Sequence, residues 1–481
     1  MGSPETTSDS AARRDALGHP VVDTDGHVVE FRPVIEEYLA EFAGAKGVDR
    51  YRNGTPWYRS DDATRRRLHL AKPSWGFPAR TMDHMASILP ALLVERMGEL
   101  GIDFVVMHPS PKKLGVPHLL DDELRQPMCR ALNAYMADLL APHAAQMTPA
   151  AVIPMHHPTE AIEELDYAVN TLGMKTTMVA SYAERRRVDG EPGTWWDNFV
   201  LDSEYDYDPV WEKFQELKIV PAFHSGTLGI ASRIVSTNST YNFIGHCAAA
   251  QEAICKALVL GGVTHRFPDL KFAFEVSGIS WAVALFSDLV DQWESRNFAS
   301  VSARDPARFD MTTAEAVFRR YAPPRLLEHS DQTEAIVARM VWPDADDLAA
   351  HGDEFAAAAI DSAEDFRDRF VRNFYFGCES SDRFGFLAFA DHILPLRAKL
   401  KAVLGTDLGH YNPTPMSRVL PEALQAVDHG LMTEADFRAM AFDNPVELFA
   451  TGNPDFFTGT AIESAVQTYR PRLDPPSRRP S

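Results

Sequence analysis

The stretch VVDTDGHVVE, residues 21–30, decides the fold, because it can be a hairpin or one continuous strand. In a hairpin, Asp25 and Gly26 form a two-residue turn between VVDT and HVVE. In a continuous strand, side chains alternate between two faces, so Asp23, Asp25 and His27 lie on one face. Two carboxylates and an imidazole on one face would make half of a metal site. The stretch alone favours neither interpretation.

Seven further short apolar runs, rich in β-branched residues, recur along the chain. They are IDFVVMHPS at 102–110, AAVIPMHHP at 150–158, KTTMVAS at 175–181, IVPAFHSG at 219–226, KFAFEVSG at 271–278, RNFYFGCES at 372–380 and AVLGTDLGH at 402–410. Amphipathic helical segments precede several of these runs; PVWEKFQELK, for example, has Val210, Phe214 and Leu217 on one face. Eight strands alternating with helices predict a (β/α)8 TIM-type barrel over residues 20–469.

Two long spacers, roughly 28–101 and 283–371, are expected to be insertions, because the other strands follow one another closely. The second spacer is rich in Ala, Asp, Glu and Arg. It is predicted to be a helical insertion that shapes access to the site, either by lying over the barrel mouth or through a subunit contact. Residues 1–19 and 470–481 are polar and rich in Pro or Ser, so we expect both ends to be disordered.

The composition limits the partners and the compartment. With 47 basic and 68 acidic residues the net charge is −21, which argues against nucleic acid or an anionic membrane as the main partner. The four cysteines are scattered without a C-x-x-C pair, so neither a disulfide framework nor a thiolate zinc site is expected. The absence of a run of 18 apolar residues and of an apolar centre near the N-terminus predicts a cytoplasmic protein.

Polar side chains follow nearly every predicted strand, at the end where a barrel has its active site. They are Asp25, His27, His108, His156, His157, His224, Glu275, Glu379, Asp407 and His410. A hairpin at residues 21–30 would not predict this convergence, so we favour the continuous strand. Imidazole and carboxylate ligands without thiolates suit Zn²⁺, Mn²⁺ or Fe²⁺. The sequence therefore predicts one divalent metal ion of open identity.

Several of these residues also have structural interpretations. His224 could be a satisfied core histidine, and Asp407 could cap the turn that follows it. Loop hydrogen bonding is as good an interpretation as ligation for His108, His156 and His157, which lie beside or near prolines. His410 could orient a metal ligand without binding metal itself.

Four motifs resemble the amidohydrolase superfamily, in the amidohydrolase-related branch that contains the aminocarboxymuconate-semialdehyde and γ-resorcylate decarboxylases. DTDGHVVE, PAFHSG, FPDLKFAFEVSGISW and GTDLGHYNP are similar to that branch's first, fifth, sixth and eighth strands, over about residues 20–455. The resemblance implies that His27, His224 and Asp407 bind the metal. Asp25 stands where many members have the first histidine of an H-x-H pair, and it is the fourth candidate ligand. Resorcylate-type decarboxylases also have a carboxylate at this position. This exchange favours a harder ion than zinc.

The same resemblance leaves the general acid or base open. Where the decarboxylases have a sixth-strand histidine, this chain has Glu275. Either Glu275 takes the catalytic role, or His246 in FIGHCAAAQ supplies the imidazole from a loop. Asp407 is expected to take or orient the proton of a metal-bound water.

The leading functional expectation is a metal-dependent hydrolase that acts on an amide, ester or C–C bond of a small aromatic or cyclic acid. The alternatives are a non-oxidative decarboxylase of an aromatic acid, an oxygen-activating non-heme metal monooxygenase or its partner subunit, and a non-catalytic structural subunit. The expected partner is a small-molecule substrate. The resemblance also implies a homodimer or another oligomer, with a hetero-oligomer as an alternative.

Overall fold

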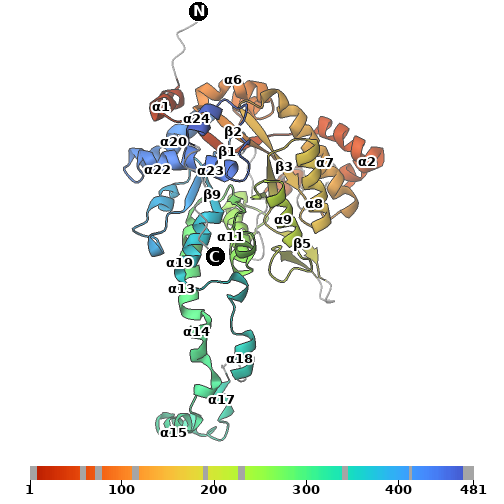
Figure 1. Cartoon of the computed structure of the whole chain (residues 1–481). Coiled ribbons are helices and arrows are strands. Elements are labelled where there is room, and N and C mark those ends of the chain that lie inside the picture. Colours follow the sequence, from red (N-terminus) through yellow and green to blue (C-terminus); the bar gives the residue numbers. More distant parts are fainter. Residues whose placement is uncertain are drawn as a thin grey trace, which may run out of the picture.

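Eight parallel strands form one sheet in the computed structural model, which describes residues 8–54, 61–70, 79–110, 119–187, 193–225, 233–338, 345–410 and 414–469 (Figure 1). The strands, in sheet order, are β1 (Val22–Val28), β2 (Phe104–Pro109), β3 (Met147–Ile153), β4 (Thr176–Ala180), β7 (Ala222–Ser225), β8 (Phe272–Phe274), β9 (Phe374–Cys378) and β10 (Lys401–Leu404). A parallel bridge between Gly26 and Leu408, just beyond β10, joins the two edges of the sheet. The sheet therefore closes as a (β/α)8 barrel, and the eight predicted strands are confirmed.

Strand β1 runs through the Asp-Gly pair without turning, so the continuous-strand interpretation is correct. Its register against β2 shifts between Asp23 and Gly26, which is a β-bulge. The bulge interrupts the alternation of side chains, and Asp23 accepts a hydrogen bond from the Thr406 backbone N–H at 2.9 Å. Asp23 therefore hydrogen-bonds the backbone after β10, and among the described residues it belongs to neither group of side chains that could hold a metal ion.

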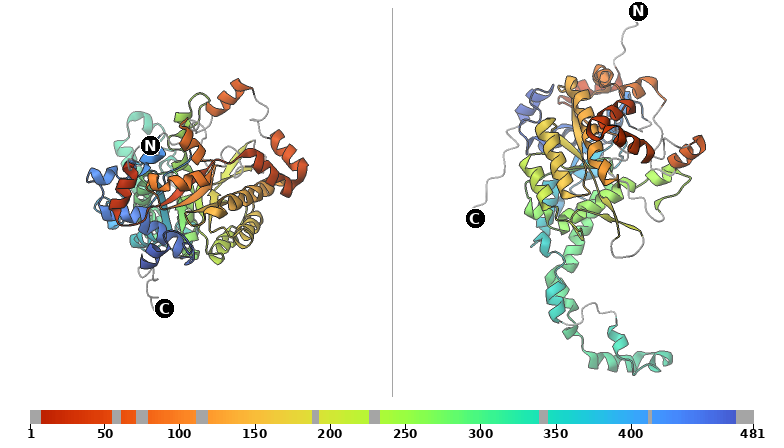
Figure 2. Two further views of the ribbon diagram at one scale, coloured as in Figure 1. Left: turned by 90° about the horizontal axis from the view of Figure 1, so that it is seen from above. Right: turned by 90° about the vertical axis from the view of Figure 1, so that its right-hand side faces the viewer.

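Helices surround the barrel and fill the long connections (Figures 1 and 2). Those before β7 are α1 (Asp9–Leu17), α2 (Arg32–Gly54), α4 (Asp62–Leu70), α5 (Thr81–Ala86), α6 (Pro90–Leu100), α7 (Asp122–Leu140), α8 (Pro158–Asp166) and α9 (Asp208–Glu216). Between β7 and β9 lie α10 (Ser239–Phe243), α11 (His246–Leu260), α12 (Val263–Arg266), α13 (Ser280–Arg296), α14 (Phe298–Val301), α15 (Met311–Tyr321), α16 (Pro324–Leu327), α17 (Glu334–Val337), α18 (Ala345–His351) and α19 (Ala363–Asn373). After β10 come α20 (Val419–Ala423), α21 (Gln425–Asp428), α22 (Glu434–Arg438), α23 (Asn444–Ala450) and α24 (Glu463–Tyr469).

A two-stranded antiparallel hairpin, β5 (Ala183–Arg186) and β6 (Thr194–Asp197), follows β4. The sequence patterns did not predict it. Helix α9, in contrast, forms where its periodicity places it, and Val210 and Phe214 are fully buried as expected.

The prediction that residues 1–19 are disordered is wrong for the part of this segment that the structure describes. Ser8 caps α1, since its side chain accepts a hydrogen bond from the Ala11 N–H. Arg13 forms two hydrogen bonds with the Asp428 carboxylate, at 2.8 and 2.7 Å, and Arg14 pairs with Asp103. These partners are far away in sequence, so the polar composition of the segment could not reveal them. Residues 1–7 and the tail predicted at 470–481 lie outside the described residues.

The expected insertion at 283–371 is helical, as predicted, but its two ends belong to the barrel. Leu285, Phe286 and Leu289 of α13 and Phe366 and Phe370 of α19 are buried against the strands or each other. The middle, from α14 to α18, forms an arm that projects away from the barrel in both views (Figures 1 and 2). The arm therefore does not lie over the barrel mouth, which was one of the two placements that the sequence had suggested.

One described segment, Ser239–Leu260, is long and apolar enough to span a membrane, with a mean hydropathy of 1.3. It consists of α10 and α11, and Gly245 between them has a positive φ of 74°. Ile254, Leu258 and other residues of α11 are buried in the barrel wall. Core helices share this composition, so the segment is weak evidence for a membrane span.

Candidate metal centre

Six ionisable side chains meet at the carboxyl ends of the barrel strands, and we call them the mouth cluster. Asp25 and His27 come from β1, His108 from β2 and His224 from β7. The segment after β10 supplies the other two, Asp407 and His410. All six are buried, with exposed fractions of 0% to 6%. Burial of so many polar groups requires partners or a ligand, because an unpaired buried charge is costly.

Four donor atoms of the mouth cluster are joined by short contacts that centre on Nε2 of His27. Nε2 of His224 lies 2.9 Å from Oδ1 of Asp25 and 3.1 Å from Nε2 of His27. Nε2 of His27 in turn lies 3.2 Å from Oδ1 of Asp25 and 3.1 Å from Oδ1 of Asp407. The structure therefore brings together all four residues that the sequence analysis named as candidate ligands.

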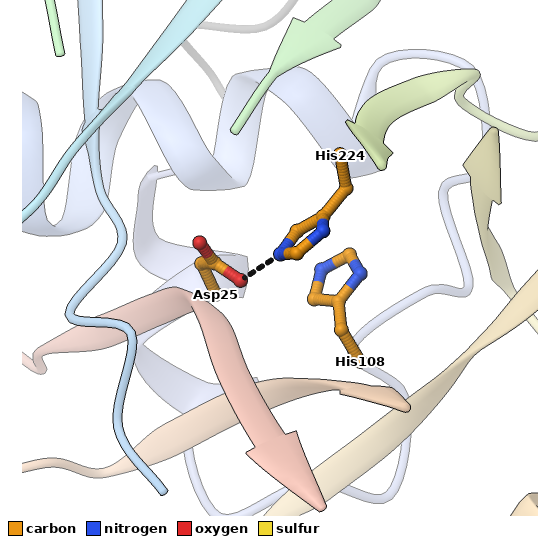
Figure 3. Close-up of side chains that lie close together, drawn as sticks. All are labelled: Asp25, His108 and His224. Carbon is orange, nitrogen blue, oxygen red and sulfur yellow. Dashed lines mark hydrogen bonds and ion pairs between the residues drawn. The ribbon is translucent and has the colours of Figure 1, made fainter. Parts of the chain in front are cut away.

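Two further histidines border these four atoms. His410 contacts Asp407 through Nδ1 at 3.0 Å, and its ring stacks on that of His27 with centroids 4.3 Å apart. The ring of His108 stacks on that of His224 at 4.7 Å, and its Nε2 lies 3.1 Å from the Thr24 carbonyl oxygen. Figure 3 shows Asp25, His108 and His224 pointing toward one another from their separate strands.

The backbone at two strand ends adopts conformations that non-glycine residues rarely have. Asp407 has a φ of 54° and Val276, directly after Glu275, has a φ of 62°. Aspartate tolerates the left-handed region, but it is strained for a β-branched residue such as valine. Strained residues of this kind concentrate at functional sites, where the surrounding structure holds them in place. Both residues follow strands that end at the mouth cluster.

The charges of the mouth cluster stabilise one another. Burial alone would lower the pKa of His27, but hydrogen bonds with Asp25 and Asp407 raise it to about 10. Burial would raise the pKa of Asp25, but His224 and His27 hold it well below its usual value. His410 and His27 likewise hold the pKa of Asp407 below its usual value against the effect of burial. Burial, and then the nearby His224, lower the pKa of His108 to about 3.

Two more carboxylates lie beside the mouth cluster. Glu275 follows β8 and accepts a hydrogen bond from the Thr24 hydroxyl at 3.2 Å; burial and then the charge of Asp25 raise its pKa well above the usual value. A Cβ at Gly377 would lie 2.2 Å from Oε2 of Glu275, so only glycine leaves room for this side chain. Glu379 follows β9, and burial and then the charges of Asp407 and Asp25 raise its pKa to about 8.

One supporting residue carried no signal in the sequence. Gln251 of α11 donates hydrogen bonds through Nε2 to the carbonyl oxygens of Phe223 and Glu275. It therefore fixes the ends of β7 and β8, which carry His224 and Glu275. A glutamine inside an apolar helix resembles many core positions, so only the packing of α11 reveals this role.

The other candidate residues lie elsewhere or are not described. His157 is exposed and caps α8, because its Nδ1 accepts a hydrogen bond from the Thr159 N–H at 3.2 Å. His156 is buried after β3 but belongs to neither group of side chains that could hold a metal ion. The backbone of His246 begins α11, but its side chain lies outside the described part of the structure.

A pocket opens beside the mouth cluster between α5 and the segment after β10. Asp407 and His410 line it on one side, and Arg80, Asp83 and His84 line it on the other. Arg80 donates to the Asp83 carboxylate at 2.8 Å and to the Thr414 carbonyl oxygen at 2.9 Å. Two members of the mouth cluster, Asp407 and His410, therefore border this pocket.

The donor set fits a divalent metal ion. Ligands at about 2.0–2.2 Å from an ion and at right angles to each other lie roughly 3 Å apart, close to the contacts between the four donor atoms. Oδ2 of Asp25 is buried and has no hydrogen-bond partner among the described residues. A bare carboxylate oxygen in this position is what a cation would neutralise.

Comparison with known proteins agrees with the barrel fold. The amidohydrolase family model matches residues 22–450. The fold is similar to that of a 2,6-dihydroxybenzoate decarboxylase solved with 2,6-dihydroxybenzoate (TM-score 0.50, 14% identity, covering 90% of this chain and 99% of the other). It is also similar to the 5-carboxyvanillate decarboxylase of Sphingomonas paucimobilis (TM-score 0.52, 14% identity, covering 89% and 98%). The chain therefore belongs to the amidohydrolase family of enzymes.

Proposed function

We propose that this enzyme is a metal-dependent decarboxylase that removes the carboxylate of a small aromatic acid without oxidation. The observation that carries the proposal is the contact of four donor atoms, two of them from the carboxylates Asp25 and Asp407, at the barrel mouth. Two solved proteins with this fold are named as decarboxylases of hydroxylated aromatic acids, which supports the assignment.

The ligand set favours decarboxylation over hydrolysis, the reaction that we expected first. Hydrolysis needs a metal-bound water whose pKa is near 7, and neutral imidazole ligands preserve the positive charge that produces it. Asp25 and Asp407 would each cancel part of that charge. Decarboxylation needs no water nucleophile; it needs an anchored substrate anion and a proton for the ring carbon.

In the proposed reaction a divalent ion would supply positive charge that binds a carboxylate or phenolate oxygen of the substrate. Glu275 keeps its proton at neutral pH, because burial and the charge of Asp25 raise its pKa. It gives this proton to the ring carbon as the bond from that carbon to the carboxylate breaks and CO₂ leaves. Solvent then reprotonates Glu275, so the products are the arene and CO₂.

The test is an assay of the Mn²⁺-, Fe²⁺- or Zn²⁺-loaded protein on a panel of hydroxylated benzoic acids in D₂O. We expect release of CO₂ and one deuterium at the ring carbon that lost it. The Glu275→Gln variant should bind the same metal but lose at least about 10²-fold in turnover, the usual contribution of a general acid. Gln251→Ala would disturb the same strand end without removing the general acid. A smaller loss of turnover in this variant than in Glu275→Gln would show that the proton donor, and not the position of the strand end, accounts for the larger loss.

Isotope labelling distinguishes the other candidate reactions. Oxygen from ¹⁸O-labelled water in a product carboxylate would establish hydrolysis instead. Oxygen from ¹⁸O₂ in the product would establish a monooxygenase. A folded protein that retains no metal and turns over none of the panel would favour the non-catalytic subunit.

We infer that the functional unit is a homodimer in which the arm contacts a second copy. Val317, Tyr321 and Leu326 on the arm are 49%, 69% and 50% exposed, although apolar side chains of this size normally find a partner. The outgoing half of the arm, residues 298–325, carries five arginines and three carboxylates, whereas the returning half, residues 328–351, carries six carboxylates and one arginine. Two antiparallel arms would therefore complement each other in charge.

The location is a separate proposal. The sequence predicts a cytoplasmic protein, and we keep this prediction. Fractionation of cells that express the full chain would test it, and recovery of the chain in washed membranes would contradict it.

A further inference from the structure

We propose that the N-terminal helix α1 positions one side of the pocket beside the mouth cluster, and that Ser10 is the positioning residue through which it acts. We call this side of the pocket, residues 414–419, the pocket wall; it contains the 3-10 helix η10 (Met416–Arg418). The inference rests on the proposed function in one respect, namely that the substrate occupies this pocket. It gives a role to a helix that the proposed reaction does not use.

Ser10 joins α1 directly to the pocket wall. It is the only buried residue of α1, with an exposed fraction of 0%. Its Oγ donates a hydrogen bond to the carbonyl oxygen of Ser417 at 2.6 Å, and Ser417 is the middle residue of η10. This bond therefore fixes the position of η10 relative to the N-terminal helix.

The packing around Ser10 leaves α1 little freedom to move. Helix α1 packs against α6, α20 and η10, and it lies beside α20 in Figure 1. Gly101 ends α6 with a φ of 75°, and a Cβ there would lie 2.8 Å from the carbonyl oxygen of Ser10 and 2.7 Å from Cδ2 of Leu420. Only glycine fits at this position without displacing α1 or α20.

The pocket wall transmits the position of Ser417 to the pocket. Thr414, Met416 and Val419 line the pocket opposite α5. The Met416 N–H donates a hydrogen bond to Oδ2 of Asp83 at 3.3 Å, and Arg80 donates one to the carbonyl oxygen of Thr414 at 2.9 Å. The wall and α5 therefore hold each other across the pocket, so a shift of η10 changes its width.

A second connection runs from the pocket wall to the end of β9. Glu422 of α20 accepts a hydrogen bond from the Thr414 hydroxyl at 3.2 Å through one carboxylate oxygen. Its other oxygen accepts one from the Ser380 hydroxyl at 3.0 Å. Ser380 directly follows Glu379, one of the two carboxylates beside the mouth cluster. A displacement of α20, against which α1 packs, would therefore move the pocket wall and this strand end together.

Helix α1 contributes little to the hydrophobic core. Leu17 is the only one of its residues that packs against the core, and this side chain is partly buried. The helix is held instead by hydrogen bonds and by the ion pairs of Arg13 and Arg14. Exposed ion pairs contribute little to the free energy of unfolding. Loss of the Ser10 contact is therefore expected to move the pocket wall rather than to unfold the barrel.

Hydrogen–deuterium exchange and steady-state kinetics of the Mn²⁺-loaded full chain test the inference. In Ser10→Ala we expect faster exchange of the backbone amides of the pocket wall and of α5, with unchanged exchange in the barrel strands. The KM for the best substrate of the benzoic-acid panel should rise by roughly 3–10-fold, the equivalent of one lost hydrogen bond. The kcat and the metal content should stay within about twofold, because the substitution weakens binding and not chemistry.

Arg13→Ala is the matched control. Arg13 lies on the same helix, but its partner Asp428 does not line the pocket. This variant should keep the native KM and the native exchange of the pocket wall.

An unchanged KM in Ser10→Ala would overturn the inference, and so would unchanged exchange in the pocket wall. A lower unfolding temperature with a native KM would show that α1 is only structural. Faster exchange of the pocket wall in a protein that releases CO₂ from no acid would refute the proposed reaction and leave the position of the wall dependent on Ser10. CO₂ release with the same KM in both proteins would refute the role of Ser10 alone.

Discussion

The mouth cluster and the arm are opposite in burial. The mouth cluster buries six ionisable side chains at 0% to 6% exposure, whereas helix α15 of the arm has no buried residue. Crowding of ionisable groups away from water and exposure of apolar surface without a cover are both unfavourable in an isolated chain. The first feature calls for a cation and the second for a protein surface. The comparison therefore separates catalysis, which we assign to the barrel, from assembly, which we assign to the arm.

The largest expected effect is the loss of metal and activity in His224→Ala. His224 contacts both Asp25 and His27, so its removal opens the centre of the mouth cluster. Outer-shell partners of metal ligands already contribute about 10–100-fold, so loss of a direct ligand should exceed 100-fold in turnover and in metal affinity. Elemental analysis and the CO₂ assay measure both. A His224→Ala variant that keeps its full metal content would contradict the assignment of metal binding to the mouth cluster.

Asp407→Asn is expected to reduce turnover by about 10²–10⁴-fold. Asp407 has a φ of 54°, and asparagine tolerates the left-handed region as aspartate does, so the fold should persist. The loss then reflects the missing charge beside His27 and His410. Circular dichroism and thermal unfolding provide the control, and Asp407→Ala should also destabilise the turn. An active Asp407→Asn enzyme would show that this carboxylate is structural.

Metal affinity should rise with pH across the neutral range. The pKa of His27 is raised to about 10 in the metal-free protein, so its ring carries a proton at neutral pH. Metal must displace that proton, and apparent affinity should therefore increase roughly tenfold per pH unit for one proton and level off above pH 10. Calorimetry in buffers of different ionisation enthalpy would count the released protons. Affinity that is independent of pH between 6 and 9 would contradict this arrangement.

The smallest effect on activity is expected in the arm. Val317→Asp and Tyr321→Asp place charges on exposed apolar positions of α15, so they should convert the proposed dimer to a monomer. Turnover and metal content should change less than about twofold, because the arm projects away from the barrel (Figure 1). Sedimentation velocity would measure the mass. Glu315→Gln on the same helix is the control, and a large loss of activity in the monomer would show that the arm serves the site.

The eight strands, the barrel and the four ligand candidates Asp25, His27, His224 and Asp407 could be predicted from the sequence. Strand periodicity is local, and the closure of a parallel barrel brings every strand end to one rim, so polar residues far apart in sequence had to converge. The choice of these four among the polar residues at the strand ends is what the resemblance to the amidohydrolase superfamily implies. The capped helix after Thr433 also follows its local signal, with Asp436 completing the capping box.

Features that depend on distant partners were decided only by the tertiary structure. The bulge between Asp23 and Gly26 shifts the register of β1, and no pattern in DTDGH marks it. Helix α1 is held by ion pairs with Asp103 and Asp428 rather than by an apolar face. Its sequence is therefore as polar as that of a disordered segment, and only the distant partners show that it is ordered. The positions of His108 and His410 likewise depend on ring stacking between distant segments: His108 of β2 stacks on His224 of β7, and His410, after β10, stacks on His27 of β1. Periodicity determines which face a side chain takes, but only packing determines which neighbours share that face.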